Sequence, residues 1–87
     1  MNREHASALA NQIRDALSVD HLDRLTSGTI EQIIEKAVEL RSIMPANRDV
    51  ELAIIYLNLM NLRDEDKQSL GLQAKYAILG AHVTFGG

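Results

Sequence analysis

The sequence predicts an all-α fold, a small antiparallel bundle of four main helices and one short helical turn, expected to be oligomeric. Apolar residues make up 46% of the 87 residues, and they recur at the three- and four-residue spacings of helices. Aromatic residues make up only 3%, whereas a β-sandwich usually draws on more aromatic and β-branched side chains. The single proline falls between two of the expected helices.

The first helix is expected over residues 3–17, because one apolar stripe runs along that segment. Its members have the spacing of an amphipathic helix: Ala6, Leu9, Ala10, Ile13, Ala16 and Leu17. A short helical turn over 20–25 follows and contributes Leu22 and Leu25 to the core. Residues 26–28 are expected to end that turn.

The second long helix is expected to open at Thr29. The Thr29 hydroxyl would accept a hydrogen bond from the backbone N–H three residues on, and Gln32 would reach back, which is a capping box. Pro45 ends the helix, since the residue before a proline is pushed out of the helical region. The buried face is predicted to consist of Ile30, Ile33, Ile34, Ala37, Val38 and Met44.

The last two helices complete a single domain over 1–83. Asn47 is the predicted N-cap of a helix that runs to about residue 62. Acidic residues at 64–66 favour the start of the final helix, because carboxylates suit the positive end of the helix dipole. That helix is expected to run to residue 82, with Gly71 and Gly80 each costing about 1 kcal/mol relative to alanine. Residues 84–87 are expected to form a flexible tail.

Both of these helices carry more apolar surface than one buried face needs. Apolar residues cover well over half the circumference of 47–62, which indicates either a central helix or a helix shared with a partner. In the last helix, one face consists of Leu70, Ala74, Ala77, Ile78 and Ala81. The nearly opposite face consists of Leu72, Tyr76, Leu79 and Val83.

This second face is the predicted contact with a protein partner. A chain of 87 residues has little material with which to cover both faces of its last helix. A second copy of the chain is the first partner to expect, because most small oligomers are symmetric homodimers. Tyr76 is the predicted anchor, since aromatic residues dominate interface energies. The alternative is that the short helical turn or the C-terminal tail folds over this face.

Patterns for catalysis and metal binding are missing from the sequence. There is no cysteine, and His5, His21 and His82 lie in three separate segments. No Gly-x-Ser-x-Gly elbow, His-Glu-x-x-His pair or phosphate-binding loop occurs. We therefore expect no enzymatic activity, no cofactor and no metal. A ligand-binding or enzymatic site formed between subunits is a further alternative, suggested only by Asn58, Asn61 and His82.

The charge pattern bears on nucleic acids and on partners of opposite charge. A net charge of −3 gives no electrostatic reason to bind nucleic acid or an anionic membrane. A dimeric helix-turn-helix regulator of DNA is the main rival, since residues 22–31 have the right proportions. Glu31, Glu35 and Glu39 would, however, repel phosphates from its second helix. Because these glutamates are spaced by four residues, they form a candidate acidic stripe that docks a basic partner.

The expected location is cytoplasmic. Residues 1–5 lack the apolar region of a signal peptide, and the longest apolar stretch, 52–62, is too short to span a bilayer. By size and character, the chain is similar to the small helical regulators, adaptors and inhibitors of bacteria and phages. The sequence therefore predicts a non-enzymatic protein-interaction module that docks an aliphatic helical surface on a partner or on itself.

Overall fold

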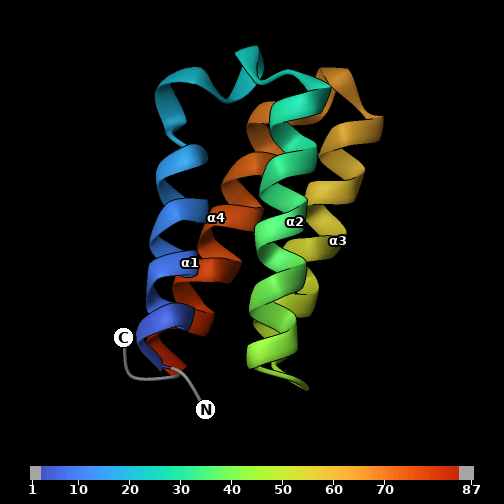
Figure 1. The fold of residues 1–87 in the computed structure, drawn as a ribbon. Helices are drawn as coiled ribbons and strands as arrows, with labels where there is room; N and C mark the ends of the chain where they lie inside the picture. The colour runs from blue at the N-terminus through green and yellow to red at the C-terminus, as the bar shows by residue number, and fades with distance from the viewer. Residues whose placement is uncertain (1–2, 85–87) are drawn as a thin grey trace.

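This computed structural model describes residues 3–84, with the exception of the side chains of residues 19 and 64. Within this range the chain forms four α-helices and two short 3-10 segments, joined by short loops. In chain order they are α1 (Arg3–Ala16), η1 (Val19–Arg24), α2 (Ser27–Ile43), α3 (Arg48–Leu62), η2 (Asp64–Asp66) and α4 (Lys67–Thr84). Figure 1 shows the four helices side by side, with the chain direction alternating from each helix to the next. The predicted all-α fold is confirmed for these residues.

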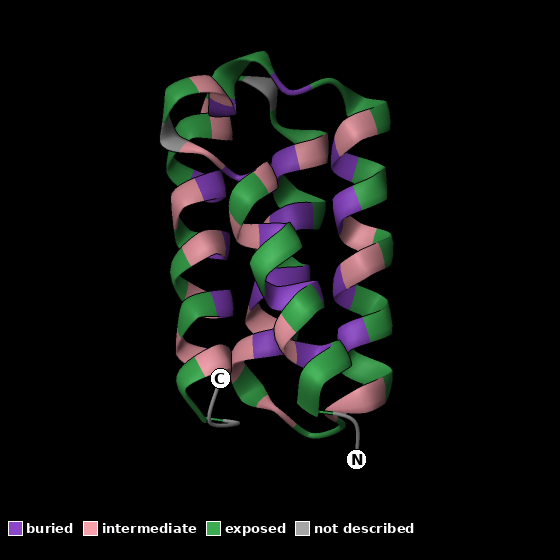
Figure 2. Ribbon diagram, turned by 60° about the vertical axis from the view of Figure 1, so that its left-hand side comes forward, coloured by how far each residue is buried: buried purple, intermediate pink, exposed green. Residues whose placement is uncertain are grey.

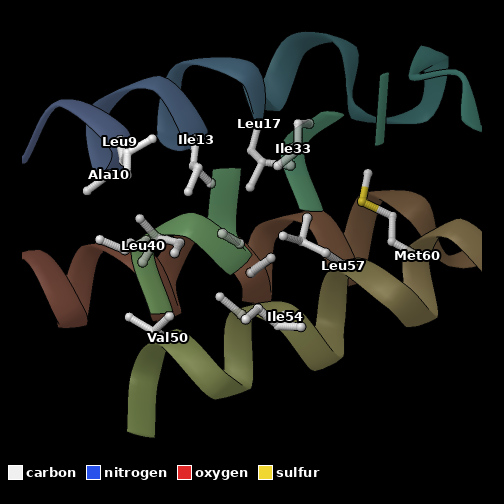
Figure 3. Packing of buried hydrophobic residues seen from close by; sticks show 14 of the residues in the cluster. Leu9, Ala10, Ile13, Leu17, Ile33, Leu40, Val50, Ile54, Leu57 and Met60 are labelled. Atoms are coloured by element: carbon white, nitrogen blue, oxygen red, sulfur yellow. The ribbon is translucent and has the colours of Figure 1, made fainter. Parts of the chain in front are cut away.

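The helices enclose one aliphatic core. The most extensive contact joins α3 to α4, and α1 closes the arrangement by packing on both α2 and α4. Figure 2 shows buried residues on the inward sides of the helices and exposed residues on the outward sides. The largest fully buried side chains, several of which appear in Figure 3, are Ile13, Leu17, Leu22, Ile30, Ile33, Leu40, Val50, Leu57, Met60 and Ile78. Each contributes about 1.5–3 kcal/mol of apolar burial to stability.

The start of α2 differs from the sequence prediction. Thr26 is the N-cap, and its Oγ1 accepts a hydrogen bond from the Thr29 backbone N–H at 3.2 Å. The predicted capping box of Thr29 and Gln32 is therefore wrong, because Thr29 already lies in the first turn. The earlier start adds Ser27 to the helix, where its hydroxyl donates to Asn61 Oδ1 at 2.8 Å and joins α2 to α3.

The connection between α2 and α3 follows the predicted signals. The helix α2 ends at Ile43, just before Pro45. Asn47 caps α3, and its Oδ1 accepts hydrogen bonds from the backbone N–H groups of Asp49 at 3.0 Å and Val50 at 3.2 Å. Between them, Ala46 has a backbone φ of 65°, in the left-handed region that favours glycine.

The segment η1 is held on the N-terminal part of α4. Gly71 is buried in α4 and Leu22 packs directly on it, so a Cβ at position 71 would lie 2.6 Å from Leu22 Cδ2. Nearby, Lys67 Nζ donates a hydrogen bond to the Leu25 backbone carbonyl at 2.7 Å. Gly71 therefore provides the space for Leu22, in addition to weakening the helix locally.

The end of α4 lies two residues beyond the predicted position. The helix continues to Thr84, so the first residue of the predicted tail is helical. The rest of that tail, residues 85–87, lies outside the described residues. Within residues 3–84, no helix combines the length and the apolar character that crossing a membrane demands.

Candidate functional site

The outer stripe of α4, which we define as Leu72, Tyr76, Leu79 and Val83, is the predicted partner-binding face. Tyr76 is 64% exposed, Leu79 is 39% exposed and Val83 is 73% exposed. Leu72 is half-buried and packs against the core. Three of the four predicted residues therefore present apolar side chains to solvent. Single exposed apolar residues are common on protein surfaces, whereas a continuous exposed apolar stripe along a helix is uncommon.

The alternative prediction was that the short helical turn or the C-terminal tail folds over this stripe. Within the described residues, Tyr76, Leu79 and Val83 stay exposed. The short segment η1 packs on α4 through Leu22 and Gly71, and Gly71 belongs to the buried face of the helix. The contact between η1 and α4 therefore lies on the core side of α4 and not on its outer stripe. The C-terminal residues 85–87, the other proposed cover, lie outside the described residues.

A second exposed stripe lies on α3 and was not among the predicted site residues. We define the outer stripe of α3 as Ile55, Leu59 and Leu62, which are 52%, 36% and 81% exposed. Their spacing of four and three residues places them on one side of α3. The buried residues Val50, Leu57 and Met60 occupy the opposite side of the same helix.

The two outer stripes lie on neighbouring helices. The helices α3 and α4 run antiparallel and form the most extensive contact of the fold. At one end of this contact, the Asp49 carboxylate lies against Gly80, where an added Cβ would approach Asp49 Oδ2 to 3.1 Å. Half-buried Tyr56 of α3 also packs against the core. Among the side chains that the structure describes, the exposed large apolar ones therefore lie on the α3–α4 pair, apart from Val38 on α2. Val38 is 39% exposed, so its predicted place on the buried face of α2 is wrong.

The predicted acidic stripe is solvent-exposed on α2. Glu31, Glu35 and Glu39 are all exposed, as their spacing predicted. The Glu39 carboxylate accepts a hydrogen bond from His5 Nε2 of α1. The acidic stripe is therefore joined to α1 at its Glu39 end, and Glu31 and Glu35 form its more open part.

One polar cluster joins α1 to α4. Arg14 Nη1 donates to His82 Nδ1 at 3.3 Å, so Nδ1 must carry a lone pair and the ring proton sits on Nε2. That Nε2–H donates to Ser7 Oγ at 3.0 Å. In an activated serine the imidazole accepts the hydroxyl proton, so this cluster has the reverse polarity. It orients α1 against α4.

The polar residues suggested for a site between subunits are all engaged within the chain. Asn61 accepts from Ser27, as described above, and Asn58 Nδ2 donates to the Ile54 backbone carbonyl at 2.9 Å. His82 belongs to the cluster with Ser7 and Arg14. Residues 3–84 enclose no pocket, and their described side chains form no group of three or more His, Asp or Glu residues that could hold a metal ion.

The fold and the exposed surface of the described residues are the basis for a functional proposal. No protein-family model, curated protein or solved structure matches the chain.

Proposed function

We propose that the chain is a non-enzymatic protein-interaction module that docks its partner on the outer stripes of α3 and α4. The observation that supports the proposal is the exposure of six large apolar side chains on these two adjoining helices, Ile55, Leu59, Leu62, Tyr76, Leu79 and Val83. The core is already complete without them, because all four helices bury a separate set of aliphatic side chains. A partner that covers the outer stripes would therefore bury apolar surface on binding and would leave the core unchanged.

The mechanism is steric docking on a rigid surface. Both stripes lie on helices of the packed core, so binding needs little ordering of the backbone and loses little conformational entropy. Tyr76 is the proposed anchor, since it combines a large ring with a hydroxyl that can bond at the rim of an interface. The proposed role is that of a small regulator, adaptor or inhibitor.

The acidic stripe is a second proposed contact, for a basic part of the same partner. Three exposed carboxylates on successive turns attract positive charge and raise the rate of encounter more than the final affinity. The replacement of Glu31 and Glu35 by lysine should then slow association strongly while leaving helix content unchanged. Equal association rates for the wild-type protein and the double lysine variant would contradict this contact.

Site-specific photo-crosslinking tests the main proposal. A benzophenone-bearing phenylalanine analogue replaces Tyr76, and in a matched control it replaces Asp15, which is exposed on α1. After irradiation in a native lysate, the variant at 76 should give discrete adducts that the variant at 15 does not give. Mass spectrometry then shows whether an adduct contains a second copy of the chain or another protein. Adducts of equal kind and amount from both positions would contradict the proposal.

A further inference from the structure

The outer stripe of α3 continues the spacing of a coiled-coil seam. Leu52 precedes Ile55, Leu59 and Leu62, so the intervals along the helix are three, four and three residues. Leu52 is half-buried, and the other three are exposed. The core-facing residues of α3 form a separate set, which means that one helix carries two apolar seams. A seam of this spacing fits between the side chains of another helix with the same repeat.

We propose that this seam pairs in antiparallel with α3 of a second copy of the chain. The inference rests on the proposed function and names its partner. Two-fold symmetry relates the residues of the seam about its midpoint, position 57. Ile55 of each copy then lies opposite Leu59 of the other, and Leu52 lies opposite Leu62. Every large side chain of the seam therefore meets an apolar partner.

The charges at the two ends of the seam select the antiparallel direction. Arg48 stands seven residues before Ile55 and so continues the line of the stripe at the start of α3. It is exposed and forms no ion pair within residues 3–84. The acidic segment η2 follows the other end of the seam, with exposed Glu65 at its middle.

Antiparallel pairing brings these opposite charges together. Helix α3 ends at Leu62 and η2 follows it at Asp64–Asp66, so Arg48 of each copy lies near the η2 end of the other. Asp66 already pairs with Arg63 at 3.6 Å, and exposed Glu65 is therefore the proposed partner of Arg48. A parallel pair would instead place Arg48 against Arg48, which costs free energy through like-charge repulsion. The complementarity occurs twice in the dimer because the interface is two-fold symmetric.

Both outer stripes can contribute to the interface of the pair. Together they leave six large apolar side chains exposed, Ile55, Leu59, Leu62, Tyr76, Leu79 and Val83, and an exposed apolar patch of this kind often marks an interface. A standard interface buries about 800 Å² on each partner, part of it from a polar rim. With α3 at the two-fold axis, α4 lies beside it in each copy and can supply the remaining contacts.

Disulfide trapping tests the register of the pair, and the absence of cysteine from the chain makes the experiment clean. The single variants Ile55→Cys and Leu59→Cys are mixed and oxidised under mild conditions. The mixture should give mainly the 55–59 cross-linked dimer, and each variant alone should give much less. Glu31→Cys, exposed on α2, serves as the control and should stay monomeric. No excess of the mixed dimer over either single variant, or equal trapping of Glu31→Cys, would overturn the proposed register.

Charge reversal tests the direction independently. Arg48→Glu alone and Glu65→Arg alone should each weaken the dimer about two- to fivefold per contact, the size expected for an exposed ion pair. The double variant Arg48→Glu, Glu65→Arg should recover the wild-type affinity. Absence of this recovery would overturn the antiparallel pairing. A chain that stays monomeric and yet cross-links another protein through position 76 would contradict the pairing alone and leave the proposed function intact.

Discussion

Leu22 of η1 packs on the bare backbone of Gly71 in α4, at a place where a single added carbon would lie 2.6 Å from the Leu22 side chain. Leu22 is fully buried, so its side chain has little room to move away. This contact, with the hydrogen bond from Lys67 to the Leu25 carbonyl, fixes η1 on the core side of α4. The outer side of α4 is left to other contacts as a result.

The Leu22–Gly71 contact predicts that Gly71→Ala lowers the free energy of unfolding by up to about 2 kcal/mol. Overpacking a core costs about 1–3 kcal/mol, and the better helix propensity of alanine returns about 1 kcal/mol of it. Urea unfolding followed by circular dichroism measures the difference. The control is Gly28→Ala, because a Cβ at position 28 meets no atom within 4 Å. A Gly71→Ala protein as stable as the Gly28→Ala protein would contradict the contact.

Backbone strain at Ala46 predicts a stabilising substitution. A non-glycine residue in the left-handed region costs about 1–2 kcal/mol, and Ala46 has a φ of 65°. Ala46→Gly removes that strain but frees the unfolded chain, so the net gain should be about 0.5–1 kcal/mol. Thermal unfolding provides the measurement, and Ala8→Gly on the exposed side of α1 should instead lose about 1 kcal/mol. A loss of stability in both variants would contradict the assigned turn.

The N-cap of α2 predicts different effects for two nearby threonines. Thr26→Ala removes the oxygen that accepts the Thr29 N–H and should cost about 1 kcal/mol. Thr29→Ala keeps that bond and loses only the contact between the two hydroxyls, 3.0 Å apart, so it should cost about 0.5 kcal/mol or less. The two midpoints of urea unfolding make the comparison. The reverse order would restore Thr29 as the cap.

The cluster of Ser7, Arg14 and His82 predicts one tautomer of the imidazole. Since the Arg14 guanidinium can only donate, neutral His82 should carry its proton on Nε2. Long-range ¹H–¹⁵N correlation spectra distinguish the two ring nitrogens directly. Arg14→Met should mix the tautomers while the fold persists. A proton on Nδ1 in the wild-type protein would contradict the arrangement.

Much of the fold follows from local sequence signals. The apolar spacing in 3–17 and the cap at Asn47 each specify a helix without reference to the rest of the chain, and the structure has both. The cap of α2 was misplaced because Thr26 and Thr29 both offer a hydroxyl. Ser27, which follows the cap, donates a hydrogen bond to Asn61 of α3, and local patterns do not show such a contact between residues far apart in the sequence.

The candidate surface could be predicted only in part. The α4 stripe was identifiable because its buried side is rich in alanine and its other side carries Tyr76 and Leu79. The α3 stripe was hidden, since apolar residues surround most of that helix and periodicity alone does not separate Ile55 from Ile54. The packing of α2 and α4 against α3 makes that distinction, as it buries Ile54 at 8% exposure and leaves Ile55 at 52%.

The solution mass tests the central claim most directly, through light scattering coupled to size exclusion over a range of concentrations. The wild-type protein should approach twice the chain mass of 9.7 kDa as its concentration rises. The variant Ile55→Lys, Leu59→Lys should remain at one chain mass with unchanged helix content, because both side chains lie outside the core. A wild-type protein of one chain mass at every concentration would contradict the α3 pairing. A dimer that persists in the variant would show that the outer stripe of α3 is not the interface.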